Sequence, residues 1–407
     1  MFVCVMTLIV GFFFKAQCLH VAADGRQLFE RLCYSDLPPL YGLRGVADNV
    51  FPYVHGELDA GGGLVNGAIE YPVLTGLFMW ASGLPVHDVN QFFVVSAILM
   101  APAGLATAYL LARMTGRRAL LWAAAPAIVL YAFHNWDLLV VGAAVAGLWC
   151  WYTRRPAWAA VWFGIGAAFK MYPAFFLAPL FFDEWRRRGA RAAFGSAIAG
   201  VTTFALVNVP FFLGGREGWL ATYEFHQRRG PNFDNLWALW FPSDTWFGEY
   251  GAITPDRLNL VTAALTGAFF VAALGYGWWR ARRDGHYPFV QVCGALLAAF
   301  LLWNKVHSPQ YALWILPFFA LVRISVVWWA LYAVVDAATY YGVFQWFYDL
   351  SQGRDFTVAK KLMIGGVWGR AVLLLVLFAV FLRARPAPEP QPDAAFLSHP
   401  PATVPTT

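Results

Sequence analysis

Five ionisable side chains set between long apolar stretches are the first candidates for chemistry in this sequence. A carboxylate can take the proton of an attacking hydroxyl group, and burial against an apolar wall raises its pKa and makes it a stronger base. Lysine and histidine can hold a phosphate leaving group and stabilise the negative charge that develops as its bond breaks. The candidates are Asp36 in CYSDLPPLYGLRG, Glu70 in IEYPVLTG, Lys170 in FKMYP, and Lys305 with His307 in WNKVHSPQY.

Three of these candidates also have a plain structural interpretation. Asp36 could cap a short loop helix or form a turn before Pro38. Lys305 and His307 could anchor a helix end at a membrane interface beside Trp303, because snorkelling lysines and aromatic residues gather there.

The remaining polar candidates also have more than one interpretation. Lys170 could be a snorkelling helix end, and Glu70 could cap a helix expected at 71–84. His134 and Asp137, in FHNWD, flank a very short turn and could either bond exposed backbone groups or line the same site as the other candidates.

The composition shows which elements must position these side chains. Of the 407 residues, 60% are apolar and only 13% are charged, about half the charged share of an ordinary soluble domain. The mean hydropathy is +0.54, and 20 Trp and 36 Phe are present. These values exclude a soluble enzyme, a disordered chain and a nucleic-acid-binding protein, and they predict an all-α polytopic membrane protein.

The apolar stretches predict about twelve transmembrane helices, given that a span needs roughly 17 to 25 mostly apolar residues. Several stretches are shorter than that, which fits helices that begin or end inside the bilayer around a polar cavity, or re-entrant segments. The predicted spans are 1–14, 90–112, 119–133, 138–152, 157–169, 171–182, 192–213, 258–279, 287–303, 309–322, 324–348 and 364–382.

The arginines of the short loops give the orientation. Alternate loops carry 15 arginines and only five acids, so this face is predicted to be cytoplasmic. Joining 157–182 into one helix would move the cluster at Arg186 to the other face, and we therefore expect a break near Lys170 and Pro173. The fifteen are Arg113, Arg117, Arg118, Arg154, Arg155, Arg186, Arg187, Arg188, Arg191, Arg280, Arg282, Arg283, Arg323, Arg383 and Arg385.

The same topology assigns the long loops to the outer face. These outer loops are 15–89, 214–257 and 349–363, and residues 71–84 are expected to form a helix in or near the outer interface. Residues 1–382 are predicted to form a single integral membrane domain. The proline-rich segment 383–407 is expected to be a disordered cytoplasmic tail.

Some further residues have open interpretations. Cys18 and Cys33 could pair if they face an oxidising compartment, or both could be free thiols. Asp336 and Arg370 lie within predicted spans, where an unpaired charge is costly, and are expected to form an ion pair. The run 215–230 mixes aromatic and basic residues, which suits either anionic lipid headgroups or a solvated loop.

The order of these motifs resembles that of the polyprenyl-phosphate-sugar-dependent glycosyltransferases of the GT-C superfamily. The elements are D-L-x-x-x-Y in the first outer loop, Y-P-x-L before the second span, K-x-Y-P in mid-chain and K-x-H-S-P-Q-Y near residue 310. The resemblance covers about residues 30–320 and is nearest to the branch with the actinobacterial phosphatidylinositol-mannoside mannosyltransferases.

This resemblance implies an inverting hexosyltransferase with a GT-C-like bundle. It implies transfer of a hexosyl group, favoured as mannosyl, from a polyprenyl-phosphate donor to a lipid or glycan acceptor at the outer leaflet. Asp36 matches the general base of the family, and Lys305 with His307 matches the element that contacts the donor phosphate. Glu70 and Lys170 would line the site, with further lining expected from Arg44, His134 and Asp137.

Two departures and two rival functions accompany this interpretation. Pro38 and Pro39 interrupt the stretch after Asp36, and Arg44 lies three residues beyond Tyr41, where related sequences often place it directly after the tyrosine. No paired acidic motif suited to a divalent ion is evident, so no cofactor is expected.

The protein is expected in the plasma membrane of a bacterium. Two other functions remain as alternatives to a glycosyltransferase: a lipid-sugar flippase and a non-catalytic scaffold for envelope assembly.

Overall fold

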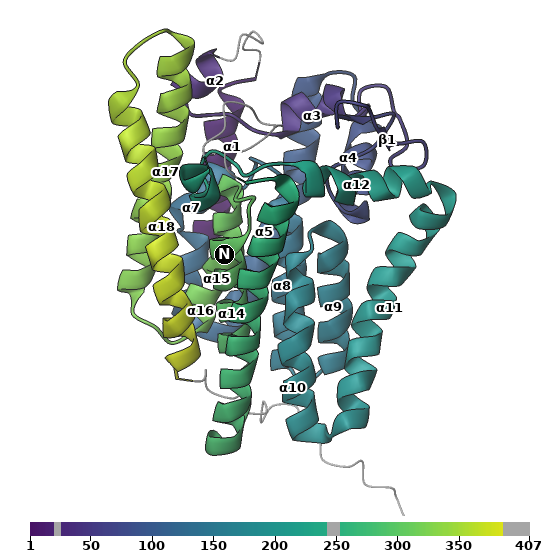
Figure 1. Ribbon diagram of the computed structural model, residues 1–407, viewed down its shortest axis with the longest axis vertical. Coiled ribbons are helices and arrows are strands. Elements are labelled where there is room, and N and C mark those ends of the chain that lie inside the picture. The colour runs from purple at the N-terminus through teal and green to yellow at the C-terminus, as the bar shows by residue number, and fades with distance from the viewer. Residues whose placement is uncertain (20–25, 242–252, 386–407) are drawn as a thin grey trace, which may run out of the picture.

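The structure, a computed structural model, describes residues 1–19, 26–241 and 253–385 and is predominantly helical (Figure 1). The tail expected at 386–407 therefore lies outside the described residues. The elements are α1 (Phe2–Ala16), α2 (Arg26–Glu30), α3 (Leu37–Leu43), β1 (Glu57–Leu58), β2 (Leu64–Val65), α4 (Val73–Gly83), α5 (Val89–Thr115), η1 (Gly116–Ala119), α6 (Leu120–Ala123), α7 (Pro126–Tyr131), α8 (Asp137–Tyr152), α9 (Pro156–Phe169), η2 (Tyr172–Phe176), α10 (Leu177–Arg188), α11 (Ala190–Gly214), α12 (Arg216–Arg228), α13 (Leu236–Trp240), α14 (Pro255–Asp284), α15 (Phe289–Trp303), η3 (Pro309–Tyr311), α16 (Ala312–Leu321), α17 (Val326–Ser351) and α18 (Thr357–Arg383).

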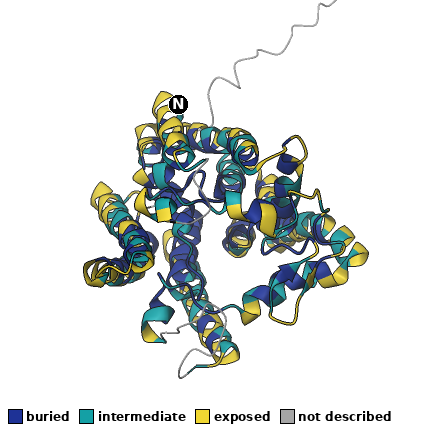
Figure 2. Cartoon of the chain, turned by 90° about the horizontal axis from the view of Figure 1, so that it is seen from above, coloured by how far each residue is buried: buried dark blue, intermediate teal, exposed yellow. Residues whose placement is uncertain are grey.

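Helices occupy every predicted span, and the all-α polytopic fold is confirmed. Among the described residues, five helical stretches are long and apolar enough to cross a membrane, and shorter apolar helices accompany them. Buried residues gather toward the middle of the bundle, while exposed residues lie on the outer faces of the peripheral helices (Figure 2). The five long stretches are Val89–Ala123, Ala190–Gly214, Pro255–Asp284, Val326–Ser351 and Thr357–Arg383.

Two interruptions in these helices are set by proline. The predicted span 119–133 is divided into α6 and α7, because Pro126 has no N–H to donate and holds the preceding Ala125 in an extended conformation. The predicted break near Lys170 is confirmed: α9 ends at Phe169, and Lys170 is extended, with φ −154° and ψ 140°. Extended residues beside a proline turn can expose side chains that a continuous helix would bury.

The long loops meet at one end of the bundle, which we call the loop end. The elements α2, α3, α4, α12 and the hairpin of β1 and β2 gather there (Figure 1). With 11 residues, α4 is short for a span, as expected for the stretch 71–84. The run 215–230 forms α12 rather than a solvated loop, and its residues Ala221 and Phe225 pack against Leu64 and Ala68 of the hairpin region.

The opposite end of the bundle, which we call the arginine-rich end, carries the clustered arginines of the short connections. Arg118 donates hydrogen bonds to the carbonyls of Phe319, Ala320, Val322 and Ile324, where α16 ends. Carbonyls of the last helical turn lack partners within the helix, so an arginine that reaches them stabilises the helix end. Arg280 does the same for Leu382 and Ala384 at the end of α18, and Arg187 and Arg188 pair with Asp183 and Glu184.

Two further expectations have definite outcomes. Cys18 and Cys33 form a disulfide, which joins the segment after α1 to the segment that leads to Asp36.

The expected ion pair of Asp336 and Arg370 does not form. Arg370 instead donates to the backbone carbonyl of Asp234 and lies 3.7 Å from a carboxylate oxygen of that residue. Asp234 belongs to the loop end, and its contact with Arg370 could not be predicted from the sequence.

Candidate active site

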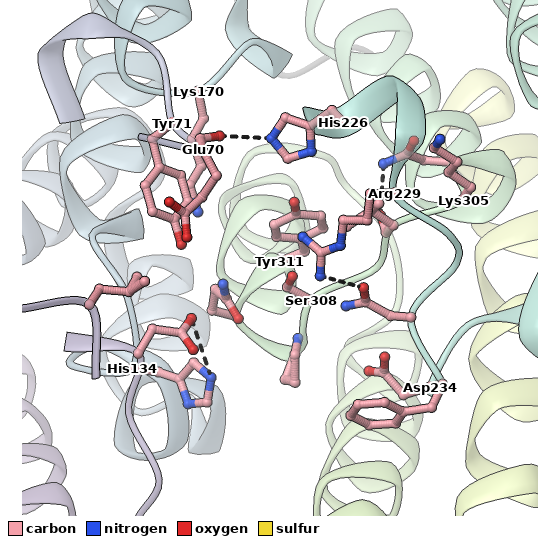
Figure 3. A pocket seen from close by; sticks show the side chains of 18 of the residues that line it. Glu70, Tyr71, His134, Lys170, His226, Arg229, Asp234, Lys305, Ser308 and Tyr311 are labelled. Carbon is pink, nitrogen blue, oxygen red and sulfur yellow. Dashed lines mark hydrogen bonds and ion pairs between the residues drawn. The ribbon is translucent and has the colours of Figure 1, made fainter. Parts of the chain in front are cut away.

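A cavity of about 660 Å³ opens between the loop end and the helices beneath it (Figure 3). It is bounded by α3, the residues before α4, the break after α9, the end of α12, the segment 229–234, the segment 304–311 and one side of α17. Of the predicted site residues, the structure brings Asp36, Glu70, His134, Lys170 and Lys305 to this cavity. Arg44, Asp137 and His307 do not line it.

Asp36 directs its carboxylate into the cavity instead of capping a helix. It stands at the start of α3 but makes no side-chain capping bond, so the capping interpretation does not apply. Oδ2 accepts a hydrogen bond of 2.8 Å from Asn135, and the backbone N–H donates to the carbonyl of His134. About a quarter (24%) of the side chain is exposed, which leaves room for a hydroxyl group to approach it.

The environment of Asp36 suits a proton acceptor. Burial raises the pKa of this carboxyl, while hydrogen bonds from Asn135 and Tyr34 and the positive charge of Lys170 oppose the rise. A carboxylate with a raised pKa is a stronger base than an ordinary surface carboxylate.

His134 and Lys15 lie next to Asp36 and contact each other. Lys15 donates to the carbonyl of Tyr34 and to the hydroxyl of Tyr340, and its Nζ lies 3.3 Å from Nδ1 of His134. The other ring nitrogen of His134, Nε2, faces Oδ2 of Asp36 at 4.0 Å. Lys15 was not among the predicted site residues. Its only signal in the sequence is that it is a lone charge at the end of the first apolar stretch.

Lys170 is fully paired. Nζ donates to Oδ2 of Asp137 at 2.7 Å and to Oδ1 of Asn135 at 3.1 Å. The other oxygen of Asp137 accepts from the indole N–H of Trp314, and this carboxylate is fully buried. Asp137 is therefore the counter-ion of a lysine that lines the cavity, rather than a lining residue itself.

Glu70 is paired in a similar way. Its carboxylate receives Nε of Arg44 at 2.6 Å and Nη2 at 3.3 Å, a two-pronged contact with the guanidinium group. The residue at the cap of α4 is Pro72, so the capping interpretation of Glu70 is wrong. Arg44 reaches the site only through Glu70, and the pair adds little net charge to the cavity.

Lys305 and Arg229 differ from Lys170, because neither has a carboxylate partner. Lys305 donates to the carbonyl of Gln227 at 3.0 Å, and Arg229 donates to Oδ1 of Asn232 at 2.7 Å. Within the described parts of the chain, no ion pair involves either cation. Burial first, and then the charge of Arg229, lower the pKa of Lys305 to about 8, so it remains largely protonated at neutral pH.

His226 completes this side of the cavity as a neutral group. Burial, followed by the charge of Arg229, lowers the pKa of its imidazole to about 4. Its Nε2 lies 2.7 Å from the carbonyl of Glu70, which it contacts as a donor. His226 and Arg229 lie in or directly after α12, within the aromatic and basic run 215–230. The sequence therefore held a signal for them, although not for their place in the cavity.

His307 does not point into the cavity with Lys305. Its Nδ1 contacts the carbonyl of Leu301 at 3.1 Å, and the ring is 2% exposed. The ring instead borders a small separate pocket beside Arg370. The extended backbone after Asn304 turns neighbouring side chains in different directions, so the predicted donor contact of His307 does not fit its position in this structure.

A metal ion was not expected, and the expectation stays a prediction. Over residues 1–19, 26–241 and 253–385, no group of three His, Cys, Asp or Glu side chains is placed to hold one.

Comparison with known proteins gives a family for the chain. The sequence profile of glycosyltransferase family 87 matches residues 70–303, a stretch that includes Glu70, Lys170 and Arg229. No curated protein matches the sequence. The crystal structure of ArnT from Cupriavidus metallidurans in the apo state is similar with a TM-score of 0.43 and 15% identity, over 94% of this chain and 76% of that chain. At this TM-score the likeness supports no conclusion about the site.

Proposed function

The chain belongs to glycosyltransferase family 87, and on that premise we propose that it is an inverting hexosyltransferase with a polyprenyl-phosphate sugar as donor. As a member of this family with several membrane spans, it is a membrane glycosyltransferase. The donor, the sugar and the acceptor are our proposal. We favour a mannosyl group as the sugar and a hydroxyl group of a lipid or glycan as the acceptor.

One observation carries the proposal: a carboxylate and two cations without carboxylate partners line the same cavity. Figure 3 shows His134 on one side and Arg229 and Lys305 on the other, and Oδ2 of Asp36 lies 4.0 Å from Nε2 of His134. Direct displacement at an anomeric carbon needs a base for the nucleophile and positive charge for the leaving group, placed on opposite faces of the sugar.

The reaction that follows from this arrangement is a single displacement. The carboxylate of Asp36 takes the proton of the acceptor hydroxyl as that oxygen attacks the anomeric carbon. The bond from this carbon to the phosphate oxygen breaks, and the electron pair leaves with the polyprenyl phosphate. The phosphate gains one negative charge, which Arg229 and Lys305 stabilise, and the configuration at the anomeric carbon is inverted.

The remaining lining of the cavity supports a lipid-linked donor. Away from the ionisable groups, the walls are apolar and aromatic, and a polyprenyl chain could lie against such walls without exposing itself to water. The apolar lining includes Leu40, Leu43, Phe233, Val343, Phe344 and Phe347.

We place the site at the outer leaflet and the C-terminus in the cytoplasm. The arginine-rich end is opposite the cavity, and clustered arginines in short loops favour the cytoplasmic side. The disulfide of Cys18 and Cys33 lies at the cavity end, and disulfides persist mainly in oxidising compartments.

The decisive experiment compares Asp36→Asn with Asp48→Asn. Purified protein in lipid nanodiscs receives radiolabelled polyprenyl-phosphate mannose and a lipid extract. We expect Asp36→Asn to lower the transfer rate by about 10²- to 10⁴-fold, the usual contribution of a general base. Asp48 is an exposed carboxylate at the same end of the bundle, and its variant should transfer at the wild-type rate.

Three results would contradict the proposal. Full transfer by Asp36→Asn would remove Asp36 as the base. Transfer from a nucleotide sugar without any lipid phosphate would refute the donor class. Movement of the lipid-linked sugar across a vesicle membrane, without transfer to an acceptor, would favour a transporter.

A further inference from the structure

The carboxylate of Asp234 lines the cavity and accepts no hydrogen bond from the described residues. It is 1% exposed, and neither Oδ1 nor Oδ2 has a donor within hydrogen-bonding distance. Buried carboxylates that lack donors are costly, and native proteins rarely keep one without a use. Figure 3 shows Asp234 on the same side of the cavity as Arg229, facing His134 across it.

Arg370 favours the charged form of this carboxylate but forms no hydrogen bond with its oxygens. A guanidinium nitrogen of Arg370 lies 3.7 Å from Oδ2 of Asp234, too far for a hydrogen bond but close enough for strong attraction. Burial raises the pKa of Asp234 to about 6, and Arg370 opposes that rise. The group is therefore an anion at neutral pH, and neither of its oxygens accepts a hydrogen bond from the described residues.

The segment that carries Asp234 is held firmly. Arg370 donates to the backbone carbonyl of Asp234, Asn232 donates to the carbonyl of His307 at 3.1 Å, and Asn235 donates to the carbonyl of Asn304 at 2.8 Å. These contacts fix the backbone on both sides of Asp234, so the carboxylate projects from a defined position. Such preorganisation is what a recognition group requires.

Gln310 adds a second acceptor of the same kind. Its Oε1 also has no donor among the described residues, its side chain is 3% exposed, and it lines the same cavity from η3. Asp234 and Gln310 come from segments far apart in the sequence, so their common character is not a local effect of one turn.

We propose that Asp234, assisted by Gln310, binds the hydroxyl groups of the transferred sugar. This inference rests on the proposed function and specifies its substrate class. A carboxylate only accepts hydrogen bonds, and its two oxygens suit two neighbouring hydroxyl groups. The site would therefore select a hexose with free vicinal hydroxyls and reject deoxy, O-methylated or O-acylated sugars, which leave the carboxylate unpaired.

The test measures binding of three lipids, so that it does not depend on an acceptor. The lipids are polyprenyl-phosphate mannose, its single-deoxy analogues, and polyprenyl phosphate without a sugar. In Asp234→Asn, affinity for the sugar-bearing donor should fall by roughly 10- to 100-fold, as expected when a charged hydrogen bond is weakened. Affinity for the sugar-free lipid should change by less than about twofold.

Asp336→Asn is the matched control. Asp336 is also a buried carboxylate, with an oxygen that accepts no bond from described residues and with Arg370 nearby, but it does not line the cavity. Its variant should bind all three lipids as the wild type does. Gln310→Ala should show a smaller loss, again confined to the sugar-bearing donor. This second variant tests the inference if Asp234→Asn does not fold.

The deoxy analogues provide the sharpest outcome. One of them should bind the wild type about tenfold more weakly than the full sugar, and Asp234→Asn should show little or none of that difference. Equal losses for both lipids in Asp234→Asn would assign the residue to holding the segment 229–235 and would overturn the inference. A wild-type protein that binds the sugar-free lipid as tightly as the donor would also overturn it. A wild-type protein that binds none of the lipids would refute the proposed function instead.

Discussion

The cations at the two ends of the bundle differ in what they contact. At the arginine-rich end, Arg118 and Arg280 are satisfied by helix-terminal carbonyls, and Arg187 and Arg188 by carboxylates. At the loop end, Lys305 contacts a single carbonyl and Arg229 a single amide oxygen. The first set stabilises the fold, and the second set, which has no carboxylate partner, is the one we propose to hold the donor phosphate.

This difference shows that the number of basic residues is a poor guide to binding. The arginine-rich end holds most of the arginines, yet the side chains of Arg118, Arg187, Arg188 and Arg280 bond to groups within the protein. Lys170 shows that location alone does not decide this. It lines the cavity, but it forms an ion pair with Asp137. The state of pairing, and not the location, separates structural cations from those that can hold an anion.

The largest expected effect comes from breaking the pair of Lys170 and Asp137. Asp137→Ala leaves a buried ammonium group without its counter-ion, and removal of one partner of a buried pair costs about 3–5 kcal/mol. A fall in the melting temperature of the detergent-solubilised protein, followed by tryptophan fluorescence, checks this. An unchanged melting temperature would place Lys170 with the unpaired cations.

A somewhat smaller effect, on activity rather than stability, is expected from Arg229. Arg229→Gln should lower the rate of transfer by about 10²- to 10³-fold, because a donor to the developing charge is lost. The melting temperature should change little, since Arg229 makes one hydrogen bond, to Asn232, which a glutamine amide can also donate. The neighbouring Arg228→Gln is the control: Arg228 is exposed and paired with Glu224, and equal losses in both variants would argue against a specific phosphate contact.

Arg118→Ala, at the arginine-rich end, should lower stability and leave activity unchanged, the opposite of what is expected for Arg229→Gln. The carbonyls at the end of α16 lose their donor, which should lower the free energy of unfolding by about 1–3 kcal/mol. The kinetic constants for transfer at a temperature well below melting should stay the same. Arg117→Ala, at an exposed neighbour, should change neither property. Lost activity in a stable Arg118→Ala protein would break the comparison between the two ends.

The smallest effect concerns pH. With a pKa of about 8, Lys305 loses its proton as the pH rises through that value, so binding of polyprenyl phosphate should weaken above pH 8. The charge of Arg229 lowers this pKa. In Arg229→Gln the midpoint should therefore move upward, by up to about one pH unit. A pH titration of lipid binding measures the shift, and a downward shift would mean that another group titrates.

Much of the fold could be predicted from the sequence. Apolar runs and arginine placement are local signals, and they located the helices and the break at Lys170. The division of 119–133 by Pro126 was missed because the run is apolar on both sides of the proline, so hydropathy shows no boundary there.

The candidate site could be predicted only in part. Asp36, Lys170 and Lys305 stood out because charges are scarce in this chain. The expected partners were less successful: His307 faces another pocket, and Arg370 contacts Asp234 instead of Asp336. Such pairings join residues far apart in the sequence, and their geometry depends on how short extended segments turn their side chains.

Lys15 has a consequence for how the protein is made. Its ammonium group contacts Tyr340, 325 residues later in the chain. At a synthesis rate of roughly 5–20 residues per second, the first helix leaves the ribosome about 16 to 65 s before that partner exists. The contacts of Lys15 beside Asp36 are therefore incomplete until α17 has been inserted. An unfinished or truncated chain, even one that holds every ionisable group from Asp36 to Lys305, would lack the hydroxyl that completes this contact.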